Sequence, residues 1–280
     1  MAPLPKTSLP MTLLRRVLEI PPTALIGLVV IAIYAFCAIF AQWIAPYGQA
    51  ELVSSQYDPW SAKHLLGTDN IGRDMFSRLI FGAQNTIGIA LLITLISFTL
   101  GGLSGLVASV RGGWIDTLLC WIADILMAIP QLIYALLLLT IFGTSVPVLI
   151  AVVAVLDATR VFRLARAVSL NVVALDYVEA ARLRGEGLWW MIRREVLPNI
   201  IAPLVAEFGV RFCFVFLFIS ALSFLGLGIQ PPLADWGSMV RDNATLITFG
   251  DITPVLPGLA IAILTLAVNF VVDWLLDKNE

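Results

Sequence analysis

Side chains that carry out chemistry are scarce in this chain. Asp, Glu, Lys and Arg together make up only 13% of its 280 residues. Lysine occurs at Lys6, Lys63 and Lys278 alone, and none of the three follows a GxxxxG pattern. Because the phosphate-binding loop of P-loop ATPases requires a lysine in that pattern, the chain cannot itself be such an ATPase.

Histidine and cysteine are also rare. His64 is the single histidine and has no cysteine near it, which excludes a zinc site or a histidine-based triad built within one chain. Cys37, Cys120 and Cys213 lie far apart in apolar runs, so we expect small buried side chains, not metal ligands or a disulfide framework. We predict no catalytic residue, no metal, no cofactor and no nucleic-acid partner for this chain.

Apolar residues are abundant instead. They make up 60% of the sequence, and the mean hydropathy is +0.95, which is typical of an all-α polytopic membrane protein. A membrane-spanning helix needs about 20 apolar residues. We predict six such helices, at residues 24–45, 79–110, two within 117–156 that separate at 143–147, 200–228 and 252–272. Gly101 and Gly105 form a small-residue face suited to close helix packing.

Arginine is concentrated in one region of the chain. The residues are Arg160, Arg163, Arg166, Arg182, Arg184, Arg193 and Arg194. Positively charged loops stay in the cytoplasm, so we expect this region and both termini inside, and the loops around His64 and Trp236 outside. The predicted segments are a cytoplasmic start at 1–23, a first transmembrane helix at 24–45, a periplasmic loop at 46–78, a core at 79–272 with five transmembrane helices and a cytoplasmic loop at 167–199, and a cytoplasmic tail at 273–280.

Residues 177–199 form the longest polar interruption, with the sequence YVEAARLRGEGLWWMIRREVLPN. Gly185 ends a helix in which Ala180 and Ala181 carry little side-chain bulk and Glu179 offers a charge, so another protein could approach this backbone closely. A second short helix follows and ends at Pro198. An ordinary basic cytoplasmic loop is the alternative interpretation of the arginines.

The order of residues in this loop resembles the EAA loop of ABC importer permeases. The resemblance rests on Glu179-Ala180-Ala181, then three residues, then Gly185, and on the ending Leu197-Pro198. It implies that the loop is a coupling helix that seats in a groove of a cytoplasmic ATPase. One departure is Glu195, which stands where the family pattern has an isoleucine.

Further strings resemble the C-type permease subunits of dipeptide, oligopeptide and nickel ABC importers. They are LGTD, two residues, GRD, two residues and SR at 66–78, ALSFLGLG at 221–228, QPP at 230–232 and WG at 236–237. The resemblance implies a type I ABC importer permease fold in the bacterial inner membrane, with a second permease, two ATPases that hold ATP and magnesium, and an extracytoplasmic substrate-binding protein as partners. It also suggests docking of that binding protein at Gly67, Asp69, Arg73, Asp74 and Trp236.

Charged residues also fall within or near the predicted spans, at Asp124, Asp157, Glu207 and Arg211. A charge at the bilayer centre costs about 2.5 to 3.5 kcal/mol, so each needs a partner or water. Glu207 and Arg211 are four residues apart on one helix face, and mutual pairing is the simplest expectation. The alternative is that they line the translocation cavity and meet the charged ends of the solute.

The sequence therefore predicts a transport subunit and not an enzyme: one half of an ATP-driven import pathway for peptides or similar small solutes. An ATP-independent secondary transporter is the competing hypothesis, but it usually shows inverted repeats and intramembrane ionisable relays, and the chain has no internal repeat and few buried acids. No residue selects among peptides, nickel chelates, glutathione, opines and oligosaccharides.

Overall fold

The computed structural model describes residues 21–277, and these are helical apart from loops and two isolated β-bridges. Residues 1–20 of the predicted cytoplasmic start and 278–280 of the predicted tail lie outside the described residues. The long helices are α2 (Pro22–Ile39), α5 (Gly88–Arg111), α6 (Gly113–Met127), α7 (Gln131–Phe142), α8 (Val146–Val173), α11 (Leu197–Phe224) and α13 (Val255–Asp277), and α4 (Met75–Gly82) and η1 (Ala83–Ile87) lead directly into α5. The short elements are α3 (Ala41–Ile44), α9 (Asp176–Leu183), α10 (Leu188–Met191), η2 (Ile192–Val196), α12 (Trp236–Asp242) and η3 (Ala244–Phe249).

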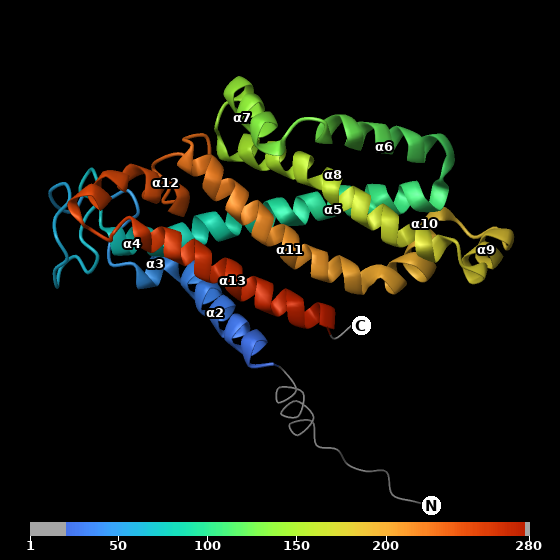
Figure 1. The fold of residues 1–280 in the computed structure, drawn as a ribbon, viewed down its shortest axis with the longest axis horizontal. Helices are drawn as coiled ribbons and strands as arrows, with labels where there is room; N and C mark the ends of the chain where they lie inside the picture. Colours follow the sequence, from blue (N-terminus) through green and yellow to red (C-terminus); the bar gives the residue numbers. More distant parts are fainter. Residues whose placement is uncertain (1–20, 278–280) are drawn as a thin grey trace, which may run out of the picture.

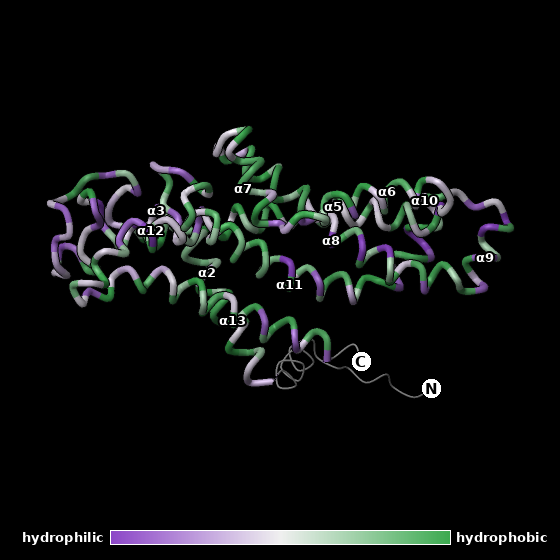
Figure 2. Tube along the Cα trace, turned by 45° about the horizontal axis from the view of Figure 1, so that its top comes forward, coloured by the Kyte–Doolittle hydropathy of each residue, from purple (hydrophilic) through white to green (hydrophobic). Residues whose placement is uncertain are grey.

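The helices form an elongated molecule with two distinct ends (Figure 1). Helices α5, α8 and α11 run along its length, and α9 projects at one end, which we call the α9 end. The opposite end, which we call the loop end, is made of residues 45–74 and 225–254. Polar residues gather at both ends, and the helices between them are mostly apolar (Figure 2).

Four helices are long and apolar enough to cross a membrane: Pro22–Ile39, Met75–Arg111, Leu188–Phe224 and Val255–Asp277. Helices α6 and α7 make a fifth if they are taken as one broken span. The prediction of an all-helical membrane protein is confirmed, whereas the described residues give four to five candidate spans and not six. The predicted span that does not qualify is α8, whose second half carries Arg160, Arg163 and Arg166.

The predicted stretch 117–156 does break at 143–145, between α7 and α8. A second break, which the sequence interpretation missed, separates α6 from α7 and bends them by 85°. Pro130 explains it, because proline lacks the amide hydrogen that a continuous helix needs and disfavours helical geometry in the residue before it.

Helices α5 and α8 lie side by side over most of their length and hold the centre of the molecule together. A Cβ atom at Gly101 would lie 2.3 Å from the carbonyl oxygen of Ala158, and one at Gly105 would lie 2.8 Å from that of Phe162. Only glycine permits backbones to approach this closely, so the predicted small-residue face is confirmed.

Helix α2 is attached at the side of this bundle and packs against α13. A Cβ atom at Gly27 would lie 2.5 Å from the carbonyl oxygen of Ala267, and the hydroxyl of Tyr34 donates to the carbonyl oxygen of Ala260 at 3.2 Å. Most of the remaining α2 surface is exposed apolar side chain, as expected for a helix that faces lipid.

Candidate functional site

Helix α9 (Asp176–Leu183) occupies the tip of the α9 end. Val178 and Ala181 are fully buried and fix the helix to the rest of the molecule. Glu179 and Ala180 are exposed, so the structure places two members of the predicted motif outward and Ala181 inward. Leu183 is 83% exposed, more than any other leucine in residues 21–277.

Two local features hold α9 in place. Gly185 has φ +83°, a left-handed conformation that ends the helix and that glycine adopts without strain. The guanidinium of Arg182 donates to the carbonyl oxygen of Val110 at 3.1 Å, which ties α9 to the last turn of α5. Leu197 and Pro198 form the first turn of α11, with Pro198 exposed and Leu197 half-buried.

At the loop end, Asp69 is the centre of a buried polar network. It is 1% exposed and accepts hydrogen bonds from the amides of Ile71 and Arg73 and from the Arg73 guanidinium, at 3.0, 2.9 and 2.6 Å. The Arg78 guanidinium lies 3.3 Å from the same carboxylate. This network folds the loop back on itself, and its ion pairs offset the cost of burying Asp69, Arg73 and Arg78.

Asp74 has a second structural role nearby. Its carboxylate accepts from the amide and hydroxyl of Ser77, at 2.8 and 2.7 Å, and so caps the first turn of α4. His64 Nδ1 lies 3.1 Å from the same carboxyl group. Because Gly67, Asp69, Arg73 and Asp74 are all buried, the structure places these predicted docking residues inside the loop and not on its surface.

Trp236 and Asp235 join the loop end to the long helices. The Trp236 ring is 2% exposed, donates from Nε1 to the carbonyl oxygen of Leu79 at 2.9 Å, and leaves no room for a side chain at Gly82. Asp235 caps α12 and accepts from the hydroxyl of Thr86 at 3.0 Å. Burial raises the pKa of the Asp235 carboxyl above its usual range.

The charged residues of the central helices form a cluster. The Arg211 guanidinium donates to Glu207 at 2.6 Å, which confirms the predicted pair. It also lies 3.7 Å from Asp157 on α8, and Asp157 in turn accepts from the hydroxyl of Ser97 on α5 at 3.0 Å. The cluster therefore links α5, α8 and α11, which the four-residue spacing alone does not reveal.

Comparison with known proteins identifies the chain. Residues 97–280 match the family described as binding-protein-dependent transport system inner membrane component, and residues 22–64 match the N-terminal transmembrane domain of oligopeptide transport permease C. The chain is 36% identical to a di/tripeptide transport system permease protein of Pseudomonas aeruginosa over 92% of its own length and 87% of the relative's. It is similar to dipeptide transport system permease proteins of Haemophilus influenzae, at 33% identity over 92% and 90% of the two chains, and of Escherichia coli K12, at 36% over 92% and 88%.

The family match covers the coupling motif, the central charge cluster and Trp236, and the match to the N-terminal domain covers α2 and the start of the loop end. The motifs at 179–198 and 221–237 lie within the first match, and the motif at 66–78 lies between the two matches. The chain therefore belongs to the family of inner membrane components of binding-protein-dependent transport systems, and it is a C-type permease subunit of an ABC importer.

Proposed function

We propose that this subunit forms one half of a translocation pathway for short peptides. A second permease subunit supplies the other half, two ATP-binding cassette ATPases bind ATP and magnesium, and an extracytoplasmic binding protein delivers the solute. The similarity to relatives named for di- and tripeptide transport over nearly the whole chain supports this solute class. Choice among individual peptides lies mostly with the binding protein.

We further propose that all six predicted spans cross the membrane, with α6 and α7 as one broken span and α8 as another. Four charged residues lie on α8, and three of them are in ion pairs: Arg166 with Asp116, Arg163 with Asp124, and Asp157 with Arg211. The α9 end then faces the cytoplasm together with both termini, and the loop end faces the periplasm. The gathering of arginines at the α9 end supports this orientation.

The observation that carries the coupling proposal is the pattern of burial on α9. Its inner side is fixed by Val178 and Ala181, and its outer side presents Glu179, Ala180 and the exposed Leu183. A charged residue, a small residue and an unburied leucine on a fixed helix suit insertion into a groove of another protein. Gly185, Leu197 and Pro198 set the direction in which α9 projects.

Movement of α9 would reach the spans through two connections. Arg182 ties α9 to the end of α5, and the close contact at Gly101 and Gly105 joins α5 to α8. When the ATPases close on ATP, these helices move together and the pathway changes from inward-open to outward-open.

The loop end is the proposed docking face for the binding protein. Gly67, Asp69, Arg73, Asp74 and Trp236 act from within by fixing its shape. The contacts themselves come from the exposed apolar side chains Leu52, Tyr57, Trp60, Leu65 and Ile71 that this network supports.

The Glu207 and Arg211 side chains remain candidates for the translocation pathway. Arg211 is shared by two carboxylates, which favours a role in holding α11 to α8. Replacement of both residues by glutamine distinguishes the two roles, because unchanged uptake by the assembled complex excludes direct contact with the solute.

Co-purification of the tagged chain tests the proposal. In detergent, the wild type is expected to retain a second permease and the ATPases, whereas Glu179→Arg keeps the permease and loses the ATPases. Glu51→Arg is the matched control, since Glu51 is exposed at the loop end and the charge change is the same. Purification of the wild-type chain alone, with ATP-independent uptake in liposomes, would overturn the proposal and favour a secondary transporter.

A further inference from the structure

Three arginines of α8 follow one another at steps of three residues, but only two of them are paired with α6. Arg166 donates twice to Asp116, at 2.5 and 2.6 Å, and Arg163 is paired with Asp124. Arg160 comes next along the helix, beside residues 127–130 of the break between α6 and α7, where no acidic residue occurs. Within residues 21–277, no carboxylate lies within ion-pair distance of Arg160.

Arg160 instead lines a cavity of about 100 Å³ at the 85° break. Gln131, the first residue of α7, lines the same cavity and is half-buried, and its side-chain amide makes no hydrogen bond within residues 21–277. The Thr159 hydroxyl, also in the lining, already donates to the carbonyl oxygen of Leu156 at 2.8 Å. The cavity therefore offers a guanidinium and an amide as donors, and no acidic side chain lines it.

This donor set has the chemistry of a carboxylate site. A guanidinium binds a carboxylate through two parallel hydrogen bonds, and an amide NH₂ adds a third donor. The nearest acid on α8, Asp157, is engaged by Ser97 and Arg211 and leaves the Arg160 guanidinium without an ion pair.

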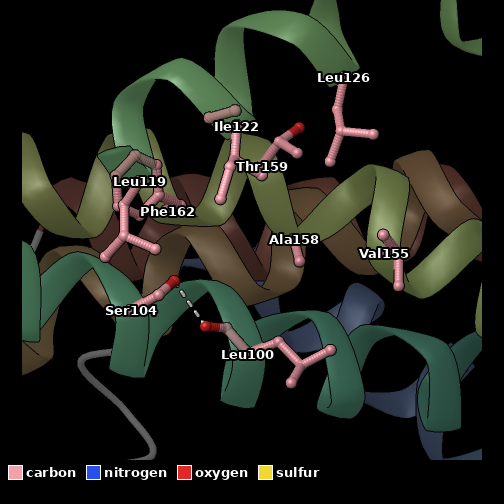
Figure 3. A pocket seen from close by; sticks show the side chains of 10 residues that line it. Leu100, Ser104, Leu119, Ile122, Leu126, Val155, Ala158, Thr159 and Phe162 are labelled. Carbon is pink, nitrogen blue, oxygen red and sulfur yellow. Dashed lines mark hydrogen bonds between the residues drawn. The ribbon is translucent and has the colours of Figure 1, made fainter. Parts of the chain in front are cut away.

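A second cavity of about 170 Å³ adjoins the first and shares Leu126 and Thr159 with it. Figure 3 shows its lining side chains converging from α5, α6 and α8, and apart from Ser104 and Thr159 these side chains are apolar. A charged cavity beside an apolar one fits a molecule in which a carboxylate is attached next to an apolar group.

We propose that the Arg160 cavity and the adjoining apolar cavity form a subsite for the carboxyl-terminal residue of a transported peptide. Arg160 and Gln131 bind the terminal carboxylate, and the apolar cavity takes the side chain of the same residue. This subsite rests on the proposed function, because it assigns a place on the pathway to the solute class named there.

The test is ATP-driven uptake by the complete complex, with its binding protein, in proteoliposomes. The probes are alanyl-leucine and alanyl-leucine amide, which differ only in the terminal carboxylate. Arg160→Gln is expected to lower uptake of the free acid about tenfold, as the loss of a hydrogen bond to a charged group implies, and to leave the amide unchanged. Arg160→Lys, which keeps the charge, is expected to restore part of the loss.

Two further variants complete the design. Arg163→Gln is the control, because it removes an arginine of the same helix that is exposed and already paired. Val155→Phe fills the apolar cavity from a half-exposed position and is expected to raise the KM for alanyl-leucine more than the KM for alanyl-glycine. Equal losses for the acid and the amide, or no loss with Arg160→Gln, would overturn the subsite.

A lipid anion is the other source of a carboxylate or phosphate at this place. Uptake is therefore compared in liposomes of phosphatidylcholine alone and in liposomes that also contain phosphatidylglycerol, to distinguish a lipid anion from the peptide carboxylate. If Arg160→Gln lowers uptake of both peptides and does so only with the anionic lipid, the solute proposal is overturned. Absence of ATP-driven uptake by the wild type overturns the proposed function itself, and the subsite with it. Normal wild-type uptake that Arg160→Gln leaves unaffected overturns the subsite alone.

Discussion

The two ends of the molecule use polar residues in opposite ways. At the loop end, Asp69, Arg73 and Asp74 are buried and bind one another or the backbone. At the α9 end, Glu179 and Leu183 are exposed, and the buried side chains beneath them are apolar. Charged residues in a loop motif can therefore serve to fold that loop, and exposure has to be known before they are assigned to a partner.

The comparison predicts that the loop end is sensitive to changes that remove a single buried charge. Asp69→Ala leaves the guanidinium groups of Arg73 and Arg78 without their carboxylate and is expected to destabilise the subunit by about 3 to 5 kcal/mol. Thermal unfolding in detergent measures the effect. Glu51→Ala, in the same loop but exposed, is the control, and equal stability of the two variants would contradict the structural role of Asp69.

The close contact between α5 and α8 lies between the two ends of the molecule. Substitution of two neighbouring glycines on α5 tests how much this contact contributes to stability. Gly101→Ala introduces a Cβ atom 2.3 Å from a backbone oxygen of α8 and is expected to cost about 1 to 3 kcal/mol. Gly102→Ala meets no atom within 4 Å and is expected to be neutral or stabilising by up to about 1 kcal/mol. The difference in melting temperature between these variants measures the contact, and similar values would mean that the helices are free to separate.

The smallest effect on folding is expected at the α9 end. Leu183→Ser should change stability by less than about 0.5 kcal/mol, because the side chain is already exposed. It should nevertheless weaken binding of the ATPases about tenfold or more, since burial of a leucine contributes about 1.5 to 3 kcal/mol. Titration of the purified ATPase onto the subunit measures this, with Leu52→Ser at the loop end as the matched control. Equal affinities would remove Leu183 from the interface.

Features that depend on neighbouring residues could be predicted from the sequence. The apolar runs predicted the helical membrane class, the pair Gly101 and Gly105 predicted a close helix contact, and Gly185 marked the end of α9. The sequence places the start of the second span at residue 79, after a loop that ends in a short amphipathic helix; in the structure α4 begins at Met75, where Asp74 is the N-cap residue. Pro130 likewise signalled the break between α6 and α7.

Features that depend on distant residues could not be predicted in the same way. Asp157 meets Arg211 across two helices, and nothing in either local sequence indicates the partner. The burial of Asp69 and Trp236 also follows from tertiary packing, because similar turn-forming sequences usually lie at the surface. The motifs identified the family, whereas the direction in which each side chain points required the structure.

The helix from Met75 to Arg111 connects the two ends of the molecule. It is continuous over 37 residues, and at about 1.5 Å per residue it is roughly 55 Å long. One end is capped by Asp74 within the loop end, and at the other the carbonyl oxygen of Val110 holds Arg182 of α9. Its single irregular turn, the π-helical η1, is the turn where Thr86 meets Asp235. Under the proposed coupling, a movement of α9 would act on this helix through Arg182 and would reach the loop end through η1, the irregular turn between Met75 and Arg111.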